Sequence, residues 1–171
     1  MNIRPAQIAD ASAIASLLNV SYRGDTSRAG WTTEADLLDG LRTTPQEITA
    51  LILGVDSLFL LACEEAKLIG CIHLSKQNNT AHFGMFSIAP TRQNCGLGKQ
   101  LLFAAEVWAQ QHWQSHQYKM LVITQRAELI AYYERRGYRR TSTSHPFPRN
   151  PVLWTPKVDG LVLEEMEKRL T

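Results

Sequence analysis

The sequence predicts an α/β fold in which a mixed sheet carries helices on its faces. Short apolar runs typical of strands alternate along the chain with longer segments that have helical apolar spacing. The 171 residues, 44% hydrophobic and 20% charged, suit one globular domain of ordinary size. Because no repeat, linker or low-complexity stretch divides the chain, we expect a single domain over residues 1–171.

The first third of the chain predicts one strand and two helices. Residues 1–6 form the strand, and Asp10 is a candidate cap for the helix that follows. A polar loop at 24–30 precedes a second helix, predicted to begin near Thr33 because three leucines fall on one side of it. These leucines are Leu37, Leu38 and Leu41.

The next helix, over residues 45–53, has the best start of the three. Thr44 is suited to accept from an amide of the first turn, and Pro45 suits the first helical position. Glu47 is spaced to accept from the Thr44 amide in return. Two apolar runs joined by residues 64–67 then predict an antiparallel hairpin. The runs are residues 57–63 and 68–75.

The second half alternates strands and helices. A strand over 81–89 stops at Pro90, and a long helix over 97–113 follows a polar loop. The helix over 128–136 ends at Gly137, a favourable residue after a helix C-terminus. The remaining expected elements are strands over 118–124, 138–144 and 161–167 and a proline-rich loop over 146–156.

Charge and cysteine content exclude several classes of protein. The net charge is +2 and the basic residues are dispersed, which argues against a dedicated nucleic-acid binder. Cys63, Cys71 and Cys95 are odd in number and lack CxxC spacing, so we expect neither a metal site nor a disulfide framework. No apolar run approaches the ~20 residues that span a bilayer, and no secretory leader is visible. We therefore expect a cytoplasmic protein without membrane partners.

The most informative segment is the loop between the strand at 81–89 and the long helix. It consists of Gln93, Asn94, Cys95, Gly96, Leu97, Gly98 and Lys99. Free amides at a helix N-terminus bind anions, and glycines let a phosphate approach the backbone closely. The loop therefore predicts a phosphate site, and an ordinary strand-to-helix turn is the alternative.

Two familiar phosphate loops do not fit this segment. The dinucleotide fingerprint requires a third glycine, but Gly98 is followed by Lys99, Gln100 and Leu101. The P-loop requires a glycine where Gln93 stands, and a serine or threonine where Gln100 stands. The pattern that remains is Gln-x-x-Gly-x-Gly.

This pattern resembles the GNAT superfamily of N-acetyltransferases, whose loop is Gln/Arg-x-x-Gly-x-Gly/Ala. The helix and turn from Tyr133 to Tyr138 are similar to the family's Tyr-x-x-x-Gly-Phe/Tyr block. The resemblance is sharp over residues 81–138. It implies a mixed, mostly antiparallel sheet of about seven strands flanked by helices on both faces.

The resemblance also implies an activity: transfer of the acetyl group of acetyl-CoA directly to a primary amine of a small molecule or peptide. Two alternatives stay open, namely an acyl-CoA-binding sensor or regulatory module of the same fold, and an enzyme that uses a longer acyl donor. No nucleic-acid partner is expected, and a homodimer is left open. The implied cofactor contacts are backbone groups of Ser87 and Ile88 for pantetheine, and residues 93–99 for the pyrophosphate.

Several single residues receive roles from the resemblance. Tyr133 matches the general acid that protonates the leaving thiolate, and we expect only one of Tyr132 and Tyr133 to face the cofactor. His82 stands where some members place a glutamate that acts as the general base. The alternatives are that a water relay takes the proton or that His82 is purely structural. His73 is a weaker candidate base. Arg126 replaces an asparagine that contacts pantetheine, and is predicted to approach either the phosphates or the acceptor.

The acceptor side is less clear from the sequence. Tyr22, Trp31 and Glu34 are candidate acceptor-pocket residues, although the two aromatics also suit simple packing and Glu34 a first-turn helix charge. Cys95 is either a small loop residue or a thiol that CoA would protect from alkylation.

Overall fold

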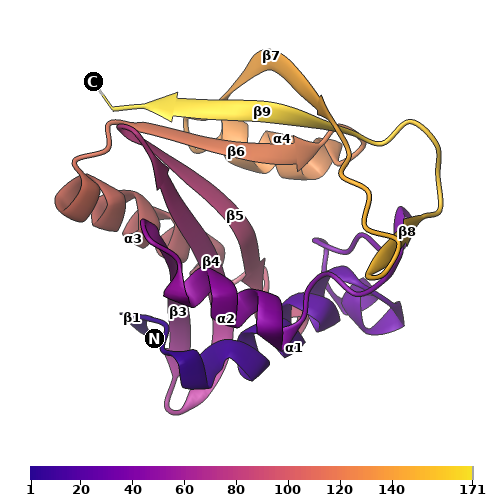
Figure 1. The fold of residues 1–171 in the computed structure, drawn as a ribbon, viewed down its shortest axis with the longest axis horizontal. Helices are drawn as coiled ribbons and strands as arrows, with labels where there is room; N and C mark the ends of the chain where they lie inside the picture. Colours follow the sequence, from indigo (N-terminus) through magenta and orange to yellow (C-terminus); the bar gives the residue numbers. More distant parts are fainter. Residues whose placement is uncertain (171) are drawn as a thin grey trace.

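The computed structural model describes residues 1–170, so residue 171, the last of the expected domain, lies outside the described residues. A seven-stranded sheet has the order β1-β3-β4-β5-β6-β9-β7 (Figure 1). Only the β5–β6 pair is parallel among its neighbours, which confirms the expected mixed, mostly antiparallel sheet. The strands are β1 (Asn2–Pro5), β3 (Ser57–Glu64), β4 (Lys67–Gln77), β5 (Thr80–Ile88), β6 (Gln117–Ile123), β7 (Arg139–Pro146) and β9 (Val162–Arg169).

Helices cover both faces of this sheet, as expected. They are α1 (Ala11–Tyr22), α2 (Pro45–Leu53), α3 (Leu97–Trp113) and α4 (Ala127–Glu134). Alternate residues of β3 face opposite sides: Phe59 and Leu61 pack with α1 and α2, whereas Leu60 and Ala62 pack in the cluster that contains α3 and α4. Within residues 1–170, no helix combines the length and apolar character that crossing a bilayer requires.

The parallel strands β5 and β6 separate partway along their length. Their register runs from Thr80 opposite Gln117 to Phe83 opposite Met120 and then stops. Beyond that point β5 has an irregular register with β4, and Met85 adopts a positive φ of 44°. β6 continues with β9 instead. The β6 side of residues 84–88 is therefore open, and this opening positions the site described below.

The helix predicted to begin near Thr33 is wrong. Residues 31–37 form turns, and Leu38 starts the short strand β2 (Leu38–Gly40), which pairs with β8 (Trp154–Pro156). Only one of the three leucines is fully buried: Leu38 packs with Ile123 and Leu161, whereas Leu41 is exposed. The leucine spacing came from a turn followed by a strand, and β8 lies more than 110 residues away in the sequence.

Two predicted helix starts are also revised. The Asp10 side chain does not cap α1. Its carboxylate accepts from the Gln7 amide at 2.8 Å and from the Arg4 guanidinium, and the contact with Gln7 caps the short helix η1 (Ile8–Asp10) instead. At α2, Thr44 accepts from the Glu47 amide as predicted, at 3.2 Å. The Glu47 carboxylate, however, accepts from the Thr43 hydroxyl at 2.8 Å rather than from the Thr44 amide.

Glu106 ties α3 to the carboxyl-terminal strands. This buried carboxylate accepts from the Tyr138 hydroxyl at 2.8 Å and from the Lys168 ammonium at 2.7 Å.

We expect Glu106→Ala to lower the free energy of unfolding by about 3 kcal/mol, because a buried ion pair that loses one partner leaves polar groups uncompensated. Urea unfolding measures the change. Gln110→Ala, on the exposed face of the same helix, is the control, and equal effects of the two substitutions would contradict the role given to Glu106.

His73 of β4 makes stability depend on pH. Its Nε2 lies 2.8 Å from the Ser57 hydroxyl and its ring packs on Phe59. Burial, and then the charge of Arg42, lowers the pKa of His73 to about 4. In the unfolded chain the imidazole takes up its proton near pH 6.5, so the unfolded state binds more protons between these values. Stability present above pH 6.5 is therefore lost as the pH falls towards 4.

We expect this loss to reach up to about 3 kcal/mol, since one pKa unit corresponds to about 1.4 kcal/mol. Urea unfolding at pH 7, 5.5 and 4.5 measures it. His73→Asn should flatten the decline, whereas His116→Asn, at an exposed histidine, should not. Parallel declines in the wild type and His73→Asn would show that other groups dominate.

Candidate active site

A cavity of about 640 Å³ opens between the end of β5, the start of α3 and one side of α4. Its walls include most of the predicted cofactor residues, together with basic and aromatic side chains of α4 and the turn after it. The lining residues most relevant here are Ser87, Ile88, Gln93, Asn94, Gly96, Gly98, Lys99, Arg126, Tyr132, Tyr133, Arg135 and Arg136. The structure thus brings the two sequence blocks, the glycine loop and the tyrosine helix, to one cavity.

The glycine loop forms the entrance to α3. Gly96 precedes the helix with a left-handed φ of 76°, and the first amides of α3 lack intrahelical acceptors. A Cβ on Gly98 would lie 2.9 Å from the Tyr132 hydroxyl oxygen, so only glycine fits without a shift. The other two loop residues lie elsewhere: the Leu97 side chain is buried in the core, and Cys95 is exposed and does not line the cavity.

Gln93 has a role that its place in the motif did not reveal. Its side-chain oxygen accepts from the Trp31 amide at 2.9 Å, and its nitrogen donates to the Ile88 carbonyl at 3.0 Å and to the Thr32 hydroxyl at 2.9 Å. The side chain is therefore engaged within the protein, where it joins the loop before β2 to the end of β5. Trp31, held by this link, lines the first cavity and does not line the second cavity described below.

Both tyrosines of α4 line the first cavity, and which of them faces a cofactor stays a prediction. Their rings pack edge to face with centroids 5.3 Å apart, and the Trp31 ring lies 5.5 Å from that of Tyr132. The Arg136 guanidinium sits 3.3 Å above the Tyr132 ring. Arg135 and Arg136 were missed as candidate site residues, although their basic charge next to the tyrosine block was a usable indication.

A second cavity, of about 380 Å³, lies on the other side of Tyr133. Its lining includes His82, Glu34 and Arg42, together with Phe147, Pro148 and Trp154. The two cavities have five lining residues in common: Tyr22, Phe86, Arg126, Leu129 and Tyr133. The two cavities therefore adjoin at a set of residues that includes Tyr133.

Tyr133 is buried, and among residues 1–170 its hydroxyl has no hydrogen-bond partner. Burial, and then the neighbouring Tyr22 hydroxyl, raises the pKa of Tyr133, so the phenol keeps its proton at neutral pH. Tyr22 donates its own hydroxyl to the Phe86 carbonyl, and burial raises its pKa to about 12. Of these two phenols at the junction, the Tyr133 hydroxyl is thus the one with a free proton to donate.

His82 lies on β5 in the second cavity and is half-buried. Burial, and then the charge of Lys119, lowers its pKa, which keeps the imidazole neutral and able to accept a proton at pH 7. His73 lines the same cavity, but its Nε2 is engaged with Ser57. Of the two histidines, His82 is the better placed to act on an incoming group.

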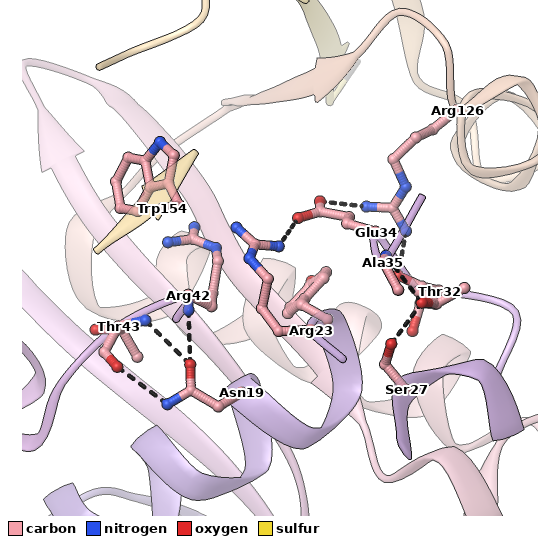
Figure 2. A network of polar contacts seen from close by, with 12 residues as sticks. Asn19, Arg23, Ser27, Thr32, Glu34, Ala35, Arg42, Thr43, Arg126 and Trp154 are labelled. Atoms are coloured by element: carbon pink, nitrogen blue, oxygen red, sulfur yellow. Dashed lines mark hydrogen bonds and ion pairs between the residues drawn. The ribbon is translucent and has the colours of Figure 1, made fainter. Parts of the chain in front are cut away.

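Glu34 does not begin a helix. Its buried carboxylate lies between two arginines, pairing with Arg23 and accepting from Arg126 at 2.9 Å (Figure 2). Arg126 also donates to the Thr32 carbonyl at 2.6 Å. The arginine that replaces the family's asparagine is therefore held by the segment before β2 and lines both cavities.

Comparison with solved structures finds the same fold. An acetyltransferase of the GNAT family from Streptococcus pneumoniae is similar over 99% of both chains, with a TM-score of 0.70 and 21% identity. The ribosomal-protein-S18-alanine N-acetyltransferase from Escherichia coli matches 99% of this chain and 94% of its own (TM-score 0.69, 14% identity). PaiA N-acetyltransferase from Thermoplasma acidophilum, in complex with coenzyme A, matches 99% and 98% (TM-score 0.66, 20% identity).

A search of curated protein sequences finds no match. The family model of the acetyltransferase (GNAT) domain matches residues 40–158, which is well over half of the chain. That span contains the glycine loop, the separating strands and the tyrosine helix. On this sequence match and the shared fold, the chain belongs to the GNAT acetyltransferase family.

Proposed function

We propose that this protein transfers the acetyl group of acetyl-CoA directly to a primary amine. The observation that carries the proposal is the meeting of two cavities at Tyr133, one beside a glycine loop and one beside a neutral histidine. Direct transfer requires donor and acceptor to be held together at one point. The structural relatives include a ribosomal-protein-S18-alanine N-acetyltransferase and an N-acetyltransferase in complex with coenzyme A.

The first cavity suits a phosphorylated thioester. The amides at the start of α3, with Lys99, Arg135 and Arg136, favour the pyrophosphate. The edge of β5 near Ser87 and Ile88 has no pairing strand on its β6 side among the described residues and is the proposed place of the pantetheine arm, although Gln93 already engages the Ile88 carbonyl. Within residues 1–170, the buried hydroxyls of Ser87 and Tyr132 have no hydrogen-bond partner, which fits a missing polar ligand.

In the proposed reaction the amine nitrogen bonds to the thioester carbonyl carbon, and the carbon–sulfur bond breaks. A backbone amide of β5 polarises the carbonyl oxygen. Tyr133 donates its proton to the departing thiolate, and His82, directly or through water, accepts the proton that the amine loses. Arg126 and Gln93 act as positioning residues, because each joins the segment before β2 to the cofactor side.

A screen of amines with acetyl-CoA and longer acyl-CoA donors, read as release of free thiol, tests the proposal. Because Cys95 is an exposed thiol, its own reaction with the reagent must be subtracted, or removed with Cys95→Ser. Acetyl-CoA-dependent thiol release with at least one amine, and an N-acetylated product by mass, supports transfer. Tight CoA binding without turnover across the panel favours the alternative of an acyl-CoA sensor.

A cytoplasmic, reducing location belongs to the proposal, since the three cysteines are free thiols.

Tyr133→Phe is expected to lower kcat by at least ~10-fold, because the thiolate loses its proton donor. CoA affinity should stay within about 2-fold of the wild type, since the aromatic ring remains in place. Steady-state kinetics with the best acceptor and calorimetric titration with CoA measure the two quantities. An unchanged kcat would remove Tyr133 from the role of acid.

His82→Asn is expected to change the pH profile of kcat/KM. The lowered pKa of His82 leaves the wild-type base neutral at pH 7, so activity should fall only as the pH drops through a value below 6.5. The substitution should lower kcat/KM by about 10-fold or more at pH 7 and abolish that acidic inflection. His116→Asn serves as the control, and retention of the inflection in His82→Asn would point to a water relay or another base.

A further inference from the structure

The second cavity carries more positive than negative charge. Of the described residues that line it, Arg23, Arg42 and Arg126 are cationic, and Glu34 is the single carboxylate. Glu34 is shared between Arg23 and Arg126, so one negative charge serves two arginines. The cavity as it stands therefore attracts an anion and repels a cation.

Of the three arginines that line the second cavity, Arg42 is the one whose side chain has no polar partner among the described residues. Its backbone amide donates to the Asn19 side chain at 2.6 Å, but its guanidinium has no hydrogen bond or ion pair within the described part of the chain. Figure 2 shows this guanidinium beside that of Arg23, in the space between Trp154 and Glu34. The guanidinium carbon lies 6.0 Å from the centroid of the Tyr22 ring, a residue that lines both cavities.

Arg23 is buried and only partly satisfied. Its side chain is 5% exposed, one terminal nitrogen pairs with Glu34, and its Nε is buried with no partner in residues 1–170. A buried charged group with an unused donor is costly unless another acceptor arrives. Two guanidinium groups that line one cavity and have free N–H donors can together donate to both oxygens of a carboxylate.

The rest of the cavity wall is neutral or apolar. Burial, and then the charge of Arg42, lowers the pKa of His73 to about 4, so it adds no charge at neutral pH. Phe147, Pro148 and Trp154 also line the cavity, with the Phe147 and Trp154 rings 6.5 Å apart. A ligand here meets both cationic side chains and aromatic surface.

We propose that the amine acceptor is an amino carboxylate of the free amino acid type with an apolar side chain. Its carboxylate binds between Arg23 and Arg42, its side chain packs on Phe147 and Trp154, and its amine reaches Tyr133 and His82. This inference rests on the proposed acetyl transfer and names its substrate class. Polyamines are disfavoured as acceptors because they would bring a second positive charge to the arginines.

Matched acceptors test the carboxylate. L-Phenylalanine and L-leucine are compared with their amides and with spermidine, at equal concentrations of acetyl-CoA. We expect kcat/KM to be at least about 10-fold higher for the acids than for the amides. The amides carry more free amine at neutral pH, because an adjacent carboxylate raises the pKa of an α-amine. Amine reactivity alone would therefore give the opposite order, and a preference for amides or spermidine would overturn the inference.

Variants then locate the binding group. Arg42→Gln should raise KM for the acids at least about 10-fold, leave KM for the amides within about 2-fold, and leave CoA binding unchanged. Arg42→Lys should recover part of the loss, because it restores the charge but not the fork. Arg149→Gln, an exposed arginine near Phe147 that does not line the cavity, controls for long-range charge. Arg23 is left intact because it holds Glu34. Equal KM changes for acids and amides would contradict a carboxylate contact.

A binding measurement separates this inference from acetyl transfer itself. Calorimetric titration with N-acetyl-L-phenylalanine and N-acetyl-L-leucine, against their amides, requires no turnover. We expect the acids to bind at least about 10-fold more tightly, with the difference lost in Arg42→Gln. If no amine is acetylated but this Arg42-dependent binding is found, the transfer fails and the carboxylate site stands. If acids and amides bind alike, or neither binds, the carboxylate site is overturned even where an amine is acetylated.

Discussion

The separation of β5 from β6 is the constraint on which the rest of the site depends. Pairing ends at Phe83 and Met120, after which backbone groups on one edge of β5 have no strand to bond with. Buried backbone groups need hydrogen-bond partners, and side chains from outside the sheet provide some of them. Tyr22 bonds to the Phe86 carbonyl and Gln93 bonds to the Ile88 carbonyl. Between these two contacts the edge stays open to a ligand.

The divergence also explains why two cavities meet. Residues 83–86 of β5 line the second cavity, residues 86–88 line the first, and Tyr133 of α4 lines both. Phe86, Leu129, Tyr22 and Arg126 complete the boundary. The burial that makes this junction apolar also raises the pKa of the phenol there, so the same packing that divides the cavities keeps the proton in place.

The segment before β2 couples the two cavities. Glu34 pairs with Arg23 and Arg126, and Arg126 bonds to the Thr32 carbonyl (Figure 2). Gln93 bonds to the Thr32 hydroxyl and to the Trp31 amide. One segment of irregular backbone is thereby attached to α1, to the glycine loop and to α4. Thr32 lines the first cavity and Glu34 the second, so the segment contributes to the walls of both.

The sequence by itself determined the features that arise from local physics. Apolar periodicity, the Thr44 cap and the glycine loop placed the main strands and the helices α1 to α4 to within a few residues, and the loop together with the Tyr133–Tyr138 block pointed to the family. Gly96 could be identified because its left-handed backbone is a local requirement, whereas the constraint on Gly98 comes from Tyr132 of another helix. Of the loop residues expected at the cofactor, all but Cys95 and Leu97 line one cavity.

Only the tertiary structure decided which long-range partners override local patterns. The leucines after Thr33 have helical spacing, but pairing of β2 with β8, and burial of Leu38 alone among the three, give a strand instead. Gln93 is suited to a phosphate loop, yet Trp31 and Thr32, distant in the sequence, engage its side chain. The unpaired Arg42 could not be found in the sequence, because an arginine's lack of a carboxylate depends on which segments fold around it.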